Sequence, residues 1–173
     1  NLLQNNTVLG LYADADDNVW AALDTGLALI HRGSRYTLLT GPMGMVYDVF
    51  DTSAGMYVAT NQNTLLYDGS GFMAVEGTQG QNWHISRFGR QIVVGNNHGT
   101  RIIDATRSYA LPGSGEASST ALRRYNVGED NDYLVEASYS ELRIYRNVDG
   151  RWVFRNNVAG FMGPVRQLEI DSH

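Results

Sequence analysis

Short apolar segments separated by polar turns repeat along the chain in a fixed order. In the first copy, an apolar segment at 8–12 leads through an Asp- and Asn-rich turn to a second at 19–23, which turns again into a third at 27–30. Short runs rich in β-branched and aromatic residues, bounded by Gly, Asp and Asn, are typical of β-strands. Each copy therefore predicts three antiparallel strands joined by tight turns.

The residue that opens the second strand of each copy marks the period of the repeat. Successive members of this set are 37, 35 and 41 positions apart, and they are Trp20, Tyr57, Ile92 and Tyr133. A fourth apolar segment follows each third strand, at 35–39, 71–75, 107–111 and 151–154. The period is close to the roughly 40–45 residues of a four-stranded propeller blade. Because no stretch shows sustained helical periodicity, a helical repeat is excluded.

We therefore predict an all-β chain, a β-propeller fragment of about four four-stranded blades. The blades are expected at approximately 5–42, 43–80, 81–118 and 119–160, with 161–173 as the start of a further blade. Propellers usually have about 4–8 blades, and the fifth copy stops before its aromatic strand. We expect an open, incomplete ring forming one partial propeller over 1–173, with a closed four-bladed ring as the alternative.

The first copy carries the most specific series of residues. It has an Asn-x-Val start at 6–8, an Asp-rich turn at 14–18, a strand through Trp20 and a Gly-Leu turn at 26–27. This series resembles the two-component regulator propeller repeat, and 165–171 resembles the opening of another such repeat. The middle copies depart from the family pattern, because the positions where it prefers Trp hold Tyr57, Ile92 and Tyr133.

The resemblance implies a setting as well as a fold. Such propellers form the periplasmic, extracytoplasmic sensor part of bacterial hybrid two-component regulators, inner-membrane proteins that also carry a membrane helix and a histidine kinase. Many members respond to oligosaccharides, so the resemblance implies a non-enzymatic segment that senses an oligosaccharide. The alternatives are a propeller scaffold for protein–protein interaction and a polysaccharide-acting propeller enzyme. The enzyme ranks last because the sequence shows no catalytic constellation.

Propeller topology predicts where a ligand binds. The start of each first strand and the turn after each second strand share one face of the ring. That face collects amides, imidazoles and aromatic rings, and the candidate ligand-binding residues are Asn61, Asn82, Trp83, His84, Asn97, His98 and Tyr139. Amides hydrogen-bond to sugar hydroxyls, and aromatic rings offer a flat surface to a sugar ring. The structural alternative is that Trp83 packs between blades and the asparagines only form turns.

Composition narrows the choice of partners. The net charge is −5 and the chain contains no Lys, which disfavours nucleic acid, because phosphate binding needs a basic surface. The chain has no Cys and no apolar run of 18 residues, so we expect no disulfide and no direct membrane insertion. A fragment would expose blade faces and strand edges. We therefore expect contacts with the remaining blades of the parent propeller, and self-association or a homodimer.

No metal or cofactor is expected. Asp14, Asp16 and Asn18 have the spacing of a calcium loop, but Val19 and Thr25 stand where that loop needs Gly and Glu. Asp and Asn favour turns because their side chains bond nearby backbone amides, so we interpret this segment as a turn. The four histidines have no metal-ligand spacing; they are His31, His84, His98 and His173.

Overall fold

The computed structural model describes residues 3, 7–24, 26–31, 33, 39, 41, 43–128 and 132–171. Every regular element among them is a strand, which confirms the all-β prediction. None of the described segments is a helix with the length and hydropathy of a membrane span. The chain divides into two compact units, Asn1–Pro42 and Met43–His173.

The first unit contains one antiparallel meander of three strands, β1 (Val8–Ala13), β2 (Val19–Leu23) and β3 (Leu27–Ile30). The fourth strand expected at 35–39 lies almost wholly outside the described residues. The β1–β2 turn is organised by Asp14, whose carboxylate accepts hydrogen bonds from the backbone amides of Asp16 and Asn18 and from the indole of Trp20. These bonds, the Trp20 bond first, lower the pKa of Asp14. Asp14 thus forms the turn predicted for this segment.

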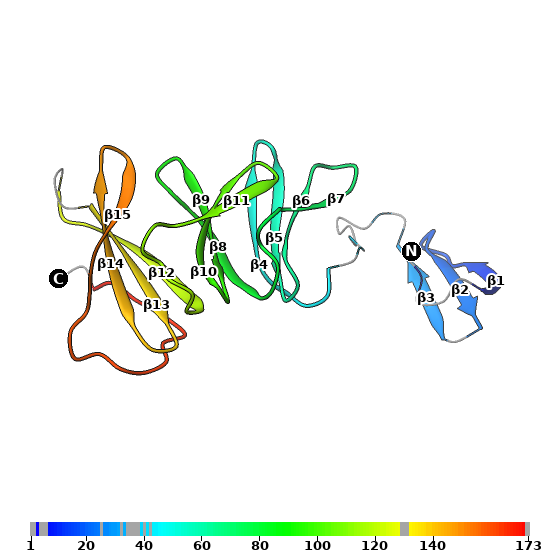
Figure 1. The fold of residues 1–173 in the computed structure, drawn as a ribbon. Coiled ribbons are helices and arrows are strands. Elements are labelled where there is room, and N and C mark those ends of the chain that lie inside the picture. The colour runs from blue at the N-terminus through cyan, green and yellow to red at the C-terminus, as the bar shows by residue number, and fades with distance from the viewer. Residues whose placement is uncertain are drawn as a thin grey trace. The chain divides into compact units, whose positions relative to one another are not determined.

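The second unit contains three four-stranded antiparallel meanders, shown in Figure 1. The first sheet is β4 (Val46–Thr52), β5 (Gly55–Thr60), β6 (Thr64–Tyr67) and β7 (Phe72–Ala74). The second is β8 (Asn82–Phe88), β9 (Gln91–Asn96), β10 (Gly99–Asp104) and β11 (Arg107–Ala110). The third is β12 (Ser119–Asn126), β13 (Asp132–Ser138), β14 (Leu142–Val148) and β15 (Arg151–Asn157). The described sheets are separate and none closes on itself.

Two apolar clusters lie between successive sheets of the second unit. Side chains of β9 alternate between them, because neighbouring residues of a strand face opposite sides of the sheet. Val94 faces the first sheet and Val93 faces the third. The first cluster is Tyr57, Ala59, Leu66, Val75, Ile85, Val94 and Ile103. The second is Phe88, Val93, Ile102, Leu111, Leu122, Leu134, Tyr145 and Trp152. The middle sheet is therefore buried on both faces.

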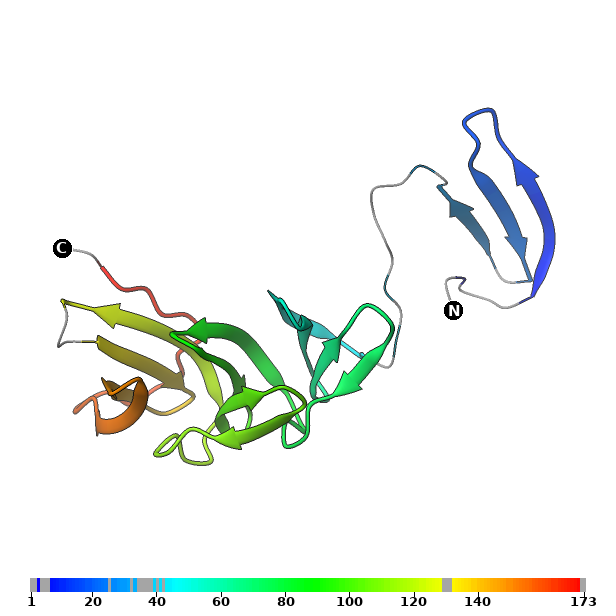
Figure 2. The same cartoon turned by 90° about the horizontal axis from the view of Figure 1, so that it is seen from above.

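The first strand of each later sheet lies against the first two strands of the sheet before it. Strands β4 and β5 contact β8, and β8 and β9 contact β12, so the sheets follow one another as seen in Figure 2. Each first strand also changes register one residue after its start, which leaves one residue bulged from the ladder. These bulged residues are Tyr47, Trp83 and Thr120. This packing matches that of propeller-like blades.

The segment after β15 runs past the ends of β12 and β13, as the red part of Figure 1 shows. Its described residues, 158–171, form no strand. The backbone amide of Val165 donates to the carbonyl of Ser138 at 3.1 Å, and the hydroxyl of Thr120 donates to the carbonyl of Val165. The segment is thereby fixed to the end of the third sheet where the first strand starts and the second strand stops.

Candidate functional site

A cavity of about 320 Å³ opens where the second and third sheets meet the C-terminal segment. We call it the Trp83 pocket, because it is lined by Trp83, Thr120, Tyr139 and Arg166. Two residues predicted from the sequence to lie on the ligand face, Trp83 and Tyr139, thus line one cavity. The other predicted residues do not line it.

Bulges place two of the lining side chains. Trp83 and Thr120 are the bulged residues of β8 and β12, and a bulge turns a side chain away from the direction that the ladder would give it. The indole of Trp83 is held against the ring of Tyr47, the bulged residue of β4, with centroids 5.0 Å apart and an interplanar angle of 38°. Within the described residues the indole Nε1 of Trp83 is buried and has no acceptor.

Tyr139 is placed by a capped turn. It follows Ser138, whose buried hydroxyl accepts hydrogen bonds from the backbone amides of Ser140 and Glu141 at 3.2 and 2.9 Å. The same device ends β5, where the hydroxyl of Thr60 accepts from Gln62 and Asn63. Tyr139 is half-exposed, because the cap fixes the backbone of the turn while the phenol extends toward solvent and the cavity.

Arg166 supplies the charge of the pocket. It is exposed and follows Val165, which is fixed to Ser138 and Thr120. Sequence reasoning missed Tyr47, Thr120 and Arg166. Tyr47 and Thr120 each occupy the second position of a first strand, as Trp83 does, so alignment of the copies was the available signal.

Two predicted asparagines are engaged in the fold. Asn82 is fully buried; its amide nitrogen donates to the carbonyls of Thr78 and Gly80 at 3.0 and 2.7 Å, and its oxygen accepts from Asn96. The side-chain oxygen of Asn61 accepts from the backbone amide of Met45 at 2.9 Å. The Asn82 side chain thus fixes the start of β8 to the segment after β7, and the Asn61 side chain joins the end of β5 to the residue before β4 within the first sheet.

Two more of the predicted residues, Asn97 and His98, form the β9–β10 turn. The backbone amide of Asn97 donates to the carbonyl of Gln81 at 2.9 Å, and the side chain packs against Gly80. His98 is exposed, and its backbone amide donates to the side-chain oxygen of Asn96 at 2.8 Å. Asn97 Oδ1 is buried with no donor among the described residues.

His84 lies next to Trp83 but faces the interior. Its ring lies over Gly95, close to the carbonyl of Ser119 on β12. Burial, followed by the nearby positive charge of Arg123, lowers the pKa of His84 to about 4. The neutral imidazole is therefore the form that the folded chain favours, and its Nε2 has no hydrogen-bond partner among the described residues.

This environment predicts a pH-dependent stability. The unfolded chain protonates His84 near its ordinary pKa of 6.5, whereas the folded chain resists protonation down to about 4. Stability is therefore complete above about pH 6.5 and falls as the pH decreases toward 4, by on the order of 2 kcal/mol because the ring retains some solvent contact. Urea unfolding from pH 4 to 7 should show a shallower dependence in His84→Gln. The exposed-site control, His98→Gln, should follow the wild-type curve; equal slopes in all three chains would contradict the burial of His84.

A polar cluster outside the Trp83 pocket is buried between the second and third sheets. The carboxylate of Glu136 on β13 is fully buried, and its oxygens accept from the hydroxyls of Thr100 and Ser114 at 2.6 and 2.7 Å and of Tyr145 at 2.5 Å. Arg143 lies 3.5 Å from the same carboxylate. Burial, then the charge of Glu136, raises the pKa of Tyr145. With its lone pairs engaged and no solvent contact, this carboxylate acts in packing.

Similarity to known proteins concerns the fold. No protein-family model and no curated protein matches the chain. The computationally designed protein Ika8 matches over 95% of this chain and 53% of its own, with 12% identity and a TM-score of 0.57. The extracellular domain of BT4673 from B. thetaiotaomicron, described as a one-component system, matches with 16% identity and a TM-score of 0.51. That match covers 90% of this chain and 25% of the domain. The chain thus spans about half the length of the designed protein and a quarter of the bacterial domain.

Proposed function

We propose that this chain is a non-enzymatic ligand-sensing segment of a periplasmic β-propeller in a hybrid two-component regulator, and that it responds to an oligosaccharide. The observation that carries the proposal is the convergence of Trp83 and Tyr139, from different sheets, on one cavity. The repeat resemblance of the first copy supports the regulator setting. The fold it shares with the extracellular domain of BT4673 is in keeping with an extracytoplasmic setting.

The packing of the second unit supports the propeller. Three meanders follow one another through their first strands, each bulged at the same position. At the end of β13, Val165 bonds to Ser138 much as Asn82 at the start of β8 bonds to Thr60 of β5. The segment after β15 thus begins its contacts as the first strand of a further blade would, which supports an open ring.

The lining of the Trp83 pocket supports a sugar ligand. An indole and a phenol offer flat apolar surface edged with polar groups, which suits a sugar ring with one apolar face. A ligand that contacts residues of two sheets and of the C-terminal segment favours the arrangement in which those three parts are in place. Such a preference for one arrangement is what a sensor needs to shift a signalling equilibrium.

Calorimetry of the 173-residue chain with a panel of neutral and acidic oligosaccharides tests this function. Trp83→Ala and Tyr139→Ala should each weaken binding about tenfold, because a well-placed aromatic contact contributes on the order of 1 kcal/mol beyond burial. Tyr109→Ala is the matched control, since Tyr109 is a half-exposed aromatic residue outside this pocket and should leave affinity unchanged. The proposal fails if no oligosaccharide binds, or if the pocket variants bind as the control does while melting normally.

One observation favours a scaffold as the second candidate function. An apolar groove of about 580 Å³ follows the outer strands of the second and third sheets, and its lining includes Tyr109, Pro112, Trp152 and Phe154. Trp152 is buried in the core cluster, whereas Phe154 and Tyr109 are half-exposed. Trp152 and Phe154 both belong to β15, and a protein partner on this groove would agree with the scaffold.

A further inference from the structure

We infer that the Trp83 pocket selects a sugar ring that carries a carboxylate, that is, a uronic acid within an oligosaccharide. The inference rests on the proposed sugar-sensing function and adds the charge of the ligand. It is based on the cationic side chain in the lining of the pocket, on the paired or neutral condition of the other basic groups nearby, and on the size of the cavity.

Among the described residues, Arg166 is the one charged residue that lines the pocket, and no carboxylate lines it. This is unlike the chain as a whole, which has a net charge of −5. Among the described residues, the guanidinium of Arg166 has neither an ion-pair partner nor a hydrogen-bond acceptor, and it is exposed. The pocket thus offers an unpaired cation beside two aromatic rings.

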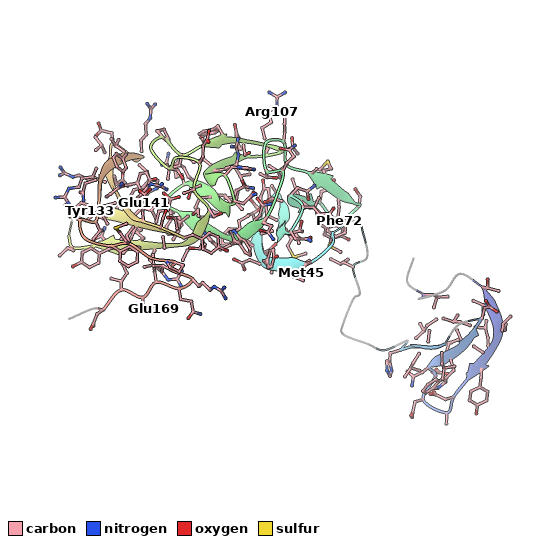
Figure 3. All side chains as sticks on the ribbon, turned by 60° about the horizontal axis from the view of Figure 1, so that its bottom comes forward. Met45, Phe72, Arg107, Tyr133, Glu141 and Glu169 are labelled. Atoms are coloured by element: carbon pink, nitrogen blue, oxygen red, sulfur yellow. The ribbon has the colours of Figure 1, made fainter. Side chains whose placement is uncertain are left out.

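A second guanidinium near His84, that of Arg123, is already paired. Its guanidinium lies 3.6 Å from the carboxylate of Glu169, which Figure 3 shows on the C-terminal segment. His84, next to Trp83, is neutral near pH 7 because its pKa is lowered to about 4. Of these three groups, Arg166 is therefore the one that offers an unpaired positive charge to a ligand.

The chemistry of these groups selects a carboxylate on a ring. A guanidinium presents two parallel N–H donors that match the two oxygens of a carboxylate. Trp83 and Tyr139 supply the surface for the ring that bears it. The cavity, at about 320 Å³, is at the lower end of the roughly 300–1,000 Å³ typical of ligand pockets, so it fits one ring of a longer chain.

The test compares each acidic probe with its own uncharged form. The probes are trisaccharides of galacturonate, glucuronate, mannuronate and guluronate, each beside its methyl ester, with calorimetry on the 173-residue chain. We expect at least one acid to bind about tenfold or more tightly than its ester. Arg166→Gln should remove that preference while the ester affinity stays the same. The matched control is Arg107→Gln, because Arg107 points away from the sheets in Figure 3 and pairs with Glu76 in an exposed site.

The outcomes separate this inference from the function on which it rests. Equal binding of acid and ester, or an equal loss of both in Arg166→Gln, overturns the selection of a carboxylate and leaves sugar sensing in place. Binding of neutral trisaccharides alone has the same meaning. Absence of binding to every acidic and neutral probe overturns both. A preference for acid that survives Arg166→Gln but disappears in Arg107→Gln would move the anion site to another part of the surface and overturn the assignment to this pocket.

Discussion

Replacing Glu136 by alanine is expected to lower the free energy of unfolding of the second unit by about 3–5 kcal/mol, the usual cost of removing one partner of a buried ion pair. Glu136 is fully buried, and its carboxylate accepts from Thr100, Ser114 and Tyr145. Without it, Arg143, which is only 6% exposed, loses its fully buried partner, and the hydroxyls of Ser114 and Tyr145 lose their acceptor. Urea unfolding at neutral pH measures the change directly.

The matched control for this prediction is Glu141→Ala. Glu141, labelled in Figure 3, also pairs with Arg143, at 3.4 Å, but its side chain is 35% exposed. A pair of this kind contributes about 0–1 kcal/mol. The double variant Glu136→Leu with Arg143→Leu should regain much of the loss, because apolar replacement of a whole buried pair is often neutral. A loss below about 1 kcal/mol in Glu136→Ala would contradict the buried cluster.

The neighbouring interface holds an apolar residue where this interface holds the carboxylate. Val94 stands two residues before Asn96, the last residue of β9. Glu136 likewise stands two residues before Ser138, the last residue of β13. Between the first and second sheets, Val94 packs in an apolar cluster and the hydroxyl of Thr64 has no partner among the described residues. Between the second and third sheets, the corresponding hydroxyl of Thr100 donates to Glu136 at 2.6 Å. Two interfaces of one architecture therefore use different chemistry.

Gly95→Ala is expected to destabilise the second unit by about 3 kcal/mol, the upper end of the usual cost of overpacking. A Cβ on Gly95 would lie 2.0 Å from Nε2 of His84 and 2.5 Å from the backbone oxygen of Ser119. The imidazole can move, but Ser119 belongs to β12, so relief of the second contact requires the second and third sheets to separate. Thermal and urea unfolding measure the loss.

Two further variants make this prediction specific. Gly71→Ala is the control, because an added Cβ there meets nothing within 4 Å, and its stability should stay within about 1 kcal/mol of wild type. Gly95→Ala combined with His84→Ala should recover only part of the loss, since the clash with Ser119 persists. Full recovery would show that the imidazole alone requires glycine at this position. It would contradict the prediction that the close approach of Ser119 on β12 also requires it.

The local pattern of the chain was sufficient to predict the strands and several turns. The alternation of apolar and polar residues has the period of a strand whatever packs against it, so the meanders of the second unit could be found without tertiary information. Asp14 was predicted to form a turn because its side chain needs only amides a few residues away. The face that holds Trp83 and Tyr139 followed from strand order alone. The total number of blades and the closure of the ring stay predictions.

Tertiary packing decided which of the candidate residues are available to a ligand. In the sequence Asn82 and Tyr139 are equivalent polar residues at strand ends, yet the amide of Asn82 is engaged by carbonyls brought from other segments, whereas Tyr139 lines a cavity. The sequence alone gives Glu136 no role, and only the approach of Thr100 and Ser114 makes it a buried anchor between sheets. Arg166 meets Trp83 because Val165 bonds to Ser138. A strand is specified by its own residues, but burial and the meeting of distant side chains depend on how whole sheets stack, which the local pattern does not contain.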